Sequence, residues 1–148
     1  MGKRADLHRV SLGHIDLHGA LLQEADLHGA DLHRADLRDA DLEGADLHRA
    51  DLTRAKLHGA ELRWADLHEA DLYAADLHGA DLKDADLHRA DLRGANLYEA
   101  DLRAADLRGA NLSGAKGLTA EQLKATSVDA KTRLPKELRN LESVRASA

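Results

Sequence analysis

The 148-residue sequence contains no cysteine, no phenylalanine and a single proline, and aromatic residues make up only 2% of it. A chain without cysteine has no disulfide framework, no cysteine-ligated zinc site and no thiol nucleophile. The opening stretch MGKRADLHRV has no apolar run of the kind found in signal peptides or membrane spans. From these absences we expect a cytoplasmic protein.

Acidic residues outnumber basic ones, and the excess lies in one part of the chain. The formal net charge is −6. Residues 1–116 hold 23 acidic and 15 basic side chains, whereas residues 117–148 hold 4 acidic and 6 basic ones. Because affinity for nucleic acids comes largely from neutralising phosphates, this balance disfavours direct binding of nucleic acid.

What the sequence has in abundance is a five-residue repeat. Leu recurs at every fifth position from Leu7 to Leu112, in 22 consecutive units, and Ala stands two residues before it except at Val10 and Ile15. On an α-helix a step of five turns each Leu by about 140°, and on a strand an odd step alternates faces, so neither element gathers the leucines on one side. The pattern instead predicts that Ala-x-Leu points inward and that the chain then turns a corner. Repetition of this unit gives a stacked polygonal coil, that is, a solenoid.

The spacing of histidine indicates how many sides the coil has. His8, His28, His48, His68 and His88 all follow Leu and recur at every fourth unit. Histidine pairs separated by three units are scarcer, which favours an even number of sides over a triangle. The spacing does not separate two sides from four, but two sides leave no room for a filled interior. We therefore expect a square coil with one unit on each side.

The units ANLYE at residues 95–99 and ADLRG at residues 105–109 follow the pattern A(D/N)LXX. This pattern resembles the pentapeptide-repeat family, and the resemblance covers about three quarters of the chain. It implies an all-β solenoid, a right-handed quadrilateral β-helix with Leu and the preceding Ala inside. We expect the β-helix over residues 1–116, with about five and a half coils, and a short helical cap over residues 117–148.

The two ends of the repeat depart from the pattern. In the first coil, residues 5–24, the bulkier Val10 and Ile15 are expected to close the open end, and Leu21 replaces the usual Asp. After the repeat, Thr119 and Gln122 form a capping-box pattern that predicts a helix over residues 120–126. A second helix is expected over residues 135–145, with one apolar face formed by Leu138, Leu141 and Val144. These tail residues are interpreted either as a lid over the last leucines or as a dimerisation helix, since some family members pair through their C-terminal ends.

Asp precedes Leu in most units, so that a square coil places like charges one above another. In the structural interpretation these carboxylates accept hydrogen bonds from nearby backbone N–H groups at the corners. In the functional interpretation, implied by family members that inhibit and protect DNA gyrase, the rows imitate DNA phosphates. Interspersed arginines weaken that field. The candidate DNA-mimicking column consists of Asp6, Asp26, Asp46, Asp66, Asp86 and Asp106.

The histidine column has three interpretations. The rings fill the surface by stacking beside the Asp two residues earlier, or they respond to pH, or adjacent rings such as His48 and His68 capture a metal ion. For the last, no preorganised third ligand is evident from the sequence, so no metal site is predicted.

Catalysis is not expected. The sequence has no recognisable nucleophile context and no Gly-rich phosphate loop, and a filled Leu/Ala interior leaves no pocket. We predict a non-enzymatic structural or protein-interaction module without a cofactor, and the alternative is a DNA-mimicking partner of DNA gyrase. The candidate interaction surface consists of Leu21, Trp64 and Tyr73.

Overall fold

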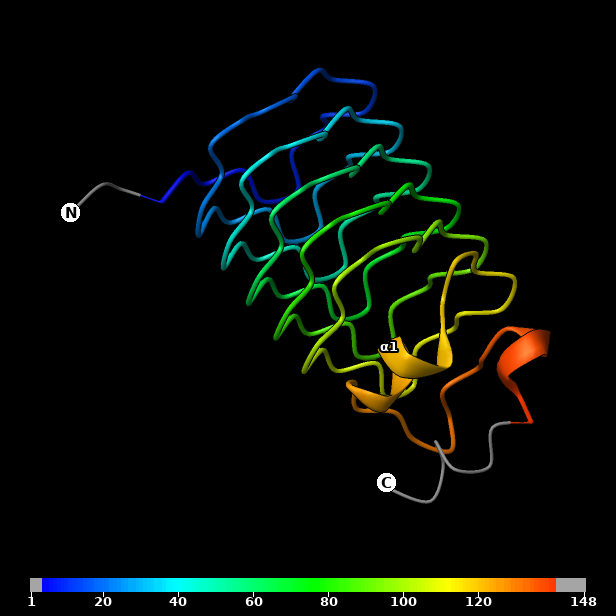
Figure 1. Ribbon diagram of the computed structural model, residues 1–148. Helices are drawn as coiled ribbons and strands as arrows, with labels where there is room; N and C mark the ends of the chain where they lie inside the picture. Colours follow the sequence, from blue (N-terminus) through cyan, green and yellow to red (C-terminus); the bar gives the residue numbers. More distant parts are fainter. Residues whose placement is uncertain (1–3, 141–148) are drawn as a thin grey trace.

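The computed structural model describes residues 4–140, and it is a stack of four-sided coils (Figure 1). Each coil contacts the next through parallel β-bridges between equivalent residues four units apart, from Asp6 and Asp26 to Asn96 and Lys116. One coil therefore holds four units, and the predicted square coil is confirmed. Within the described chain the bridges are isolated single-residue pairs. No continuous β-strand forms there, although the sequence predicts an all-β fold.

Four backbone hydrogen bonds are repeated in nearly every unit, and three of them illustrate the pattern. In one example, the Leu47 N–H donates to the Asp66 carbonyl of the next coil at 2.7 Å, and the Asp66 N–H donates to the Ala45 carbonyl at 2.9 Å. The Ala50 N–H closes the corner by donating to the Leu47 carbonyl at 3.0 Å. The first two bonds hold neighbouring coils in register, and the third turns the chain toward the next side.

Every corner requires a left-handed backbone conformation. The residue two positions after Leu has a positive φ in all units from Arg9 to Gly114. Glycine, which adopts this conformation without steric cost, fills eight of these positions. The other positions hold 14 non-glycine residues with φ between 53° and 62°. The architecture therefore imposes the conformation even where the side chain opposes it.

Leu and Ala side chains fill the interior of the solenoid. From Ala25 to Leu112 every inward Leu and Ala side chain is at most 3% exposed, and most are fully buried. Burying a Leu stabilises the fold by about 1.5 to 3 kcal/mol. In the first coil Leu7, Leu12 and Leu17 are only partly buried, and Val10 and Ile15 are also partly buried.

The tail covers the other end of the leucine column. Helix α1 spans Ala120–Lys124 and begins at a capping box made by Thr119 and Gln122, as predicted, although it ends before residue 126. It ends there because the chain returns to the coil, where Ser127 bridges to Asp106. Leu123 and Leu134 are 1% and 4% exposed and belong to the core. This placement agrees with the interpretation of the tail as a lid.

The second predicted helix is a short 3-10 turn in the described part of the chain. It spans Lys136–Leu138 and follows Pro135. Leu138 is partly buried against the core, whereas Leu141 and Val144 lie outside the described residues. The apolar face predicted for residues 135–145 is therefore not tested. Among residues 4–140, no helix has the length and apolar character needed to cross a membrane.

Candidate interaction surfaces

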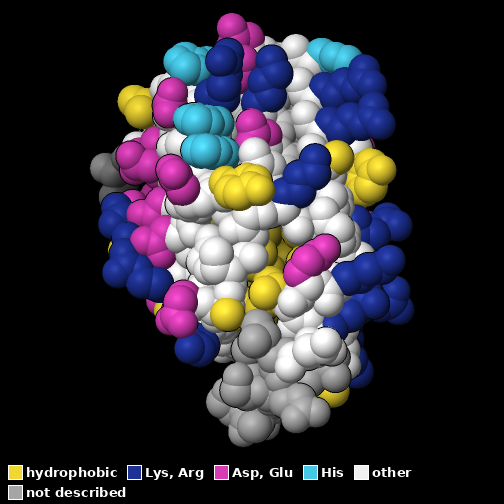
Figure 2. All heavy atoms as spheres, turned by 45° about the vertical axis from the view of Figure 1, so that its right-hand side comes forward, with side chains coloured by type: hydrophobic (Ala, Val, Ile, Leu, Met, Phe, Trp, Pro, Cys, Tyr) yellow, Lys and Arg dark blue, Asp and Glu magenta, His cyan; other side chains and the backbone are white. Residues whose placement is uncertain are grey.

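The square coil gives the solenoid four outer walls, each made of one unit per coil. We number them by their units in the first coil: wall 1 begins with residues 5–9, wall 2 with 10–14, wall 3 with 15–19 and wall 4 with 20–24. Each wall continues at every fourth unit. Figure 2 shows stacked histidine side chains beside acidic ones, and rows of Lys and Arg, on the part of the surface in view.

The Asp before Leu is placed by a hydrogen bond to the backbone. The Asp26, Asp46 and Asp66 Oδ1 atoms each accept from the main-chain N–H two residues later, at 3.1 to 3.2 Å. Asn96 does the same for Tyr98 at 3.2 Å. This bond agrees with the structural interpretation of the Asp columns and explains why Asn substitutes for Asp.

On wall 1 the candidate DNA-mimicking column alternates with imidazoles. Nδ1 of His28, His48 and His68 lies 2.6 to 2.7 Å from Oδ1 of the Asp two residues earlier, and His8 pairs with Asp6 in the same way. Hydrogen bonding to His8 lowers the pKa of Asp6 and raises the pKa of His8. At Asp106, the last member of the column, the Arg108 guanidinium donates a hydrogen bond to the carboxylate and lowers the pKa of Asp106. Most carboxylates of the column therefore already have a partner on the protein.

Wall 4 carries a continuous chain of ion pairs. Its contacts include Arg63 to Glu43 at 2.9 Å and Lys83 to Asp101 at 3.2 Å. Arg103 donates to Asp101 at 2.7 Å, and this hydrogen bond lowers the pKa of the Asp101 carboxyl. The full series runs along the wall through Glu43, Arg63, Asp81, Lys83, Asp101 and Arg103.

The structure does not bring the three predicted interaction residues together. Leu21 and Trp64 both lie on wall 4 and are 77% and 57% exposed. Tyr73 lies on wall 2, the opposite wall, where the Arg93 guanidinium covers its ring at 5.5 Å. Tyr98 on wall 3 is 54% exposed and escaped the sequence prediction. The signal that would have found it was available, because Tyr98 follows Leu directly, as Tyr73 does.

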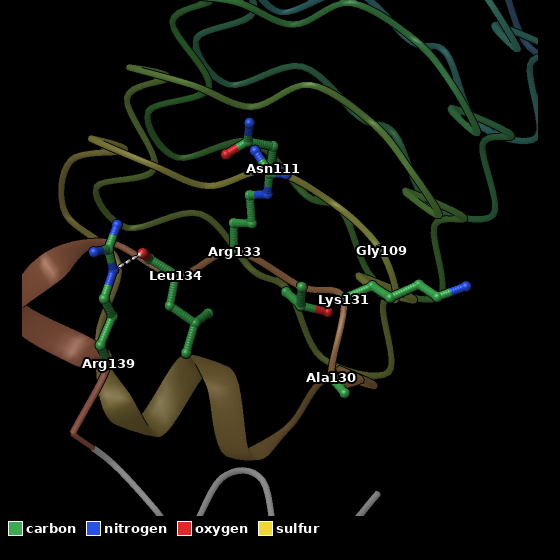
Figure 3. A pocket seen from close by; sticks show the side chains of 8 residues that line it. Gly109, Asn111, Ala130, Lys131, Arg133, Leu134 and Arg139 are labelled. Atoms are coloured by element: carbon green, nitrogen blue, oxygen red, sulfur yellow. Dashed lines mark hydrogen bonds between the residues drawn. The ribbon is translucent and has the colours of Figure 1, made fainter.

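A shallow polar hollow lies beside the cap (Figure 3). Lys131, Arg133 and Arg139 line it, and the Arg139 Nε donates to the Leu134 carbonyl at 3.1 Å. This hollow is formed by the tail and the last coil and not by the interior of the solenoid.

The fold and its walls define a class of protein: a four-sided solenoid of A(D/N)LXX units whose interior is filled and whose outer surface is repetitive. The sequence matches the pattern of the pentapeptide repeats, in 8 copies over residues 3–39, 30–68 and 85–116. The chain belongs to the pentapeptide-repeat family.

Solved structures agree with this assignment. The chain is 39% identical to HetL, a pentapeptide repeat protein involved in heterocyst differentiation regulation in the cyanobacterium Nostoc sp. strain PCC 7120, with a TM-score of 0.45. The match covers 88% of this chain and 64% of HetL, so the chain spans less than two thirds of that relative. A pentapeptide repeat protein of the Arabidopsis thaliana thylakoid lumen is 33% identical over 76% of this chain and 74% of its own, with a TM-score of 0.50.

A further solved structure is less similar. QnrB1, a plasmid-mediated fluoroquinolone resistance protein, is 21% identical over 82% of this chain and 73% of its own, with a TM-score of 0.32. At this identity the similarity concerns the fold alone. A comparison with curated protein sequences finds no match.

Proposed function

We propose that this protein is a non-enzymatic scaffold that binds a protein partner through wall 4. The observation that carries the proposal is that Leu21 and Trp64 are both exposed on the same wall, two coils apart. Large exposed apolar side chains beside charged ones are typical of binding surfaces.

Trp64 differs from the other residues at strained corners by its large exposed ring. It occupies a corner position with a φ of 56°, a conformation that favours glycine. Thirteen other non-glycine corners share this conformation because the fold requires it, so the strain does not single out Trp64. Its ring is 57% exposed, and a large aromatic side chain left in solvent is available to a partner. The Arg63 guanidinium lies 5.5 Å from the ring centroid, and Trp and Arg are the residues most enriched at the energetic centres of interfaces.

The surrounding ion pairs supply the polar part of such a surface. Arg63 contacts Glu43 at 2.9 Å and lies 3.7 Å from Asp81, so its guanidinium is held in place beside the ring. A surface held rigid before binding loses little entropy on association.

The test is affinity capture with the Trp64→Gly variant. Glycine relieves the backbone strain at this corner, so a loss of binding would not reflect unfolding. We expect a partner recovered with the natural protein and with the control Tyr73→Ser, which changes the opposite wall, to be lost with Trp64→Gly. Equal recovery by all three proteins would overturn the assignment to wall 4.

The alternative is a DNA-mimicking protein that binds DNA gyrase. Its support is the regular spacing of Asp on wall 1 and the acidic balance of residues 1–116. The imidazoles beside Asp6, Asp26, Asp46 and Asp66 weaken that support, because they compete for the same carboxylates. A supercoiling assay decides the matter, since no effect on gyrase at micromolar protein would discard the alternative.

Two further proposals concern the oligomeric state and the cellular location of the protein. The tail is a candidate dimerisation surface, and light scattering on the whole protein and on a variant ending at Lys116 would test whether pairing depends on it. We also propose a cytoplasmic location, which a fluorescent fusion would test.

A further inference from the structure

The alternating carboxylates and imidazoles of wall 1 form a ladder. We call it the Asp–His ladder and define it as Asp6, His8, Asp26, His28, Asp46, His48, Asp66, His68 and Asp86. Each imidazole stands between the Asp of its own unit and the Asp of the next coil. In all four steps, one atom from each of these three residues lies within 4.8 Å of the other two.

The donor atoms suit a transition metal ion. Zinc and related divalent ions bind imidazole nitrogen and carboxylate oxygen at about 2.0 to 2.2 Å, so two ligands of one ion lie at most about 4 Å apart. Small side-chain rotations within groups already inside 4.8 Å satisfy this limit. The charge also fits, since each step sets two carboxylates against one imidazole.

The stacking of the rings fixes how the ligands are shared. The His28 and His48 rings are 5.0 Å apart and inclined by 7°, and His48 and His68 are 4.8 Å apart and inclined by 1°. A metal ion bonds to an imidazole nitrogen in the plane of the ring, and parallel planes this far apart have no common point. In this stacked arrangement two imidazoles do not direct nitrogen atoms at one ion, so we infer that each ion takes one imidazole and two carboxylates.

The backbone positions the ligand residues before any ion arrives, and the 2.6 Å hydrogen bond between the His48 Nδ1 and the Asp46 Oδ1 opens when the ring turns to bind an ion. The Asp46 Oδ1 accepts from the His48 backbone N–H at 3.1 Å, and the bridge between Asp46 and Asp66 fixes the distance between coils. The His48 and Asp46 side chains are 27% and 42% exposed, so water can reach an ion and complete its coordination.

We propose that the Asp–His ladder binds divalent first-row transition metal ions, each held by one imidazole nitrogen and two carboxylates. Neighbouring steps share a carboxylate: Asp46 belongs to the His28 step and to the His48 step. Ions in alternate steps avoid this sharing, so the ladder holds two ions.

The structure contains a matched control on wall 3. His58 and His78 are stacked at 4.9 Å and 10°, as in the ladder, but Lys56 occupies the position of the Asp before His58. Among the described residues 4–140, neither ring belongs to a group of three metal ligands. Asp76 precedes His78 as Asp46 precedes His48, and it also bonds the backbone N–H two residues later, at 3.2 Å.

One similar group lies outside the ladder, on wall 2. It consists of Asp31, His33 and Asp51, whose ligand atoms also lie within 4.8 Å of one another. The group offers a single imidazole with two carboxylates, as each ladder step does. Any ion that it holds is expected to be unaffected by changes on wall 1, so it serves as an internal reference for the titrations.

The experiment is calorimetric titration of the tag-free protein with zinc chloride after treatment with a chelator. The key variant changes Asp26 and Asp66 together to Asn, because every step of the ladder uses one of these two carboxylates. Asn keeps the oxygen that accepts the backbone bond, as Asn96 does on wall 3. We expect the double variant to weaken zinc binding to the ladder at least tenfold. The control Asp76→Asn is expected to bind like the natural protein.

A second pair of variants removes the imidazoles. His8, His28, His48 and His68 are changed together to Gln, and the control changes His58 and His78 to Gln. We expect the first to lose the ladder's two zinc ions and the second to keep them, with circular dichroism confirming that both are folded. The proposal is wrong if the natural protein binds no zinc at millimolar concentration, or if the double variant of Asp26 and Asp66 and the four-histidine variant bind as the natural protein does.

Discussion

The two ends of the solenoid bury the same leucine column to different extents. Near the C-terminal end Leu102 and Leu107 are 2% and 0% exposed, and Leu123 of α1 and Leu134 belong to the same buried core. In the first coil Leu7, Leu12 and Leu17 stay partly exposed, and among residues 4–140 no segment covers them. The backbone of the two coils is the same. The difference shows that a coil becomes fully buried only when another layer is placed on it.

The largest loss of stability is expected from a substitution in the middle of the leucine column. Its effect on the free energy of unfolding is the reference for substitutions at the two ends. Leu67→Ala removes a fully buried side chain that cannot be replaced by rearrangement of a regular stack. We expect a loss of about 3 to 5 kcal/mol in the free energy of unfolding. Chemical denaturation measures it, and a loss below about 1 kcal/mol would show that the interior tolerates cavities.

The next effect compares the ends directly. Leu134→Ala in the cap removes a side chain that is 4% exposed, whereas Leu12→Ala removes a partly exposed one. We expect the cap variant to lose about 2 to 3 kcal/mol and the first-coil variant about 1 kcal/mol. The measurement is again denaturant unfolding, with both variants side by side. Equal losses would mean that the cap does not bury the last layer more effectively than the first coil buries itself.

A smaller effect tests whether the ends differ in backbone as well as in burial. Gly19 in the first coil and Gly79 in the middle both have a φ of +64°, and nothing lies within 4 Å of a Cβ added at either position. Substitution by Ala therefore introduces only backbone strain, which costs about 1 kcal/mol. We expect Gly19→Ala and Gly79→Ala to lower the melting temperature equally. If Gly19→Ala has clearly less effect, the first coil is already frayed in the folded protein.

The smallest effect concerns charge on the walls, which does not depend on the ends. Hydrogen bonds from the Arg38 guanidinium lower the pKa of Asp36 from 3.8 to about 2. A depressed carboxyl pKa stabilises the fold at neutral pH, and this stabilisation is lost as the pH falls from 3.8 to about 2. Arg38→Gln is expected to raise the Asp36 pKa toward 3.8, as measured by NMR titration. An unchanged pKa would assign the shift to the backbone bond instead.

The sequence was sufficient for the architecture because the architecture has one period. The regular Leu and Ala positions predict the inward side chains, and the histidine spacing together with the room needed for a filled interior gives the four-unit coil. The handedness came only from the resemblance to the family. The left-handed corners at Arg34 or Trp64 were not predictable, because the fold overrides the local preference of these residues.

The surface was less predictable than the interior. Placing Trp64 and Tyr73 on walls needs only the period, and the period already separates them. Which histidine pairs with which carboxylate is a matter of side-chain rotation, so the sequence does not decide it. His28 bonds Asp26 through its ring, whereas His78 bonds Asp76 only through its backbone N–H.

The register between coils has a consequence for how such a chain tolerates insertions and deletions. Since each coil offers the next an identical set of donors and acceptors, adding or removing one whole coil lengthens or shortens the rod and leaves every side chain facing its original direction. A change of a single unit is equally compatible with the core, yet it rotates everything downstream by a quarter turn. An extra unit between Leu47 and Leu52 would thus cut the Asp–His ladder into two halves on adjacent walls, abolishing its long-range order without disturbing a single buried leucine.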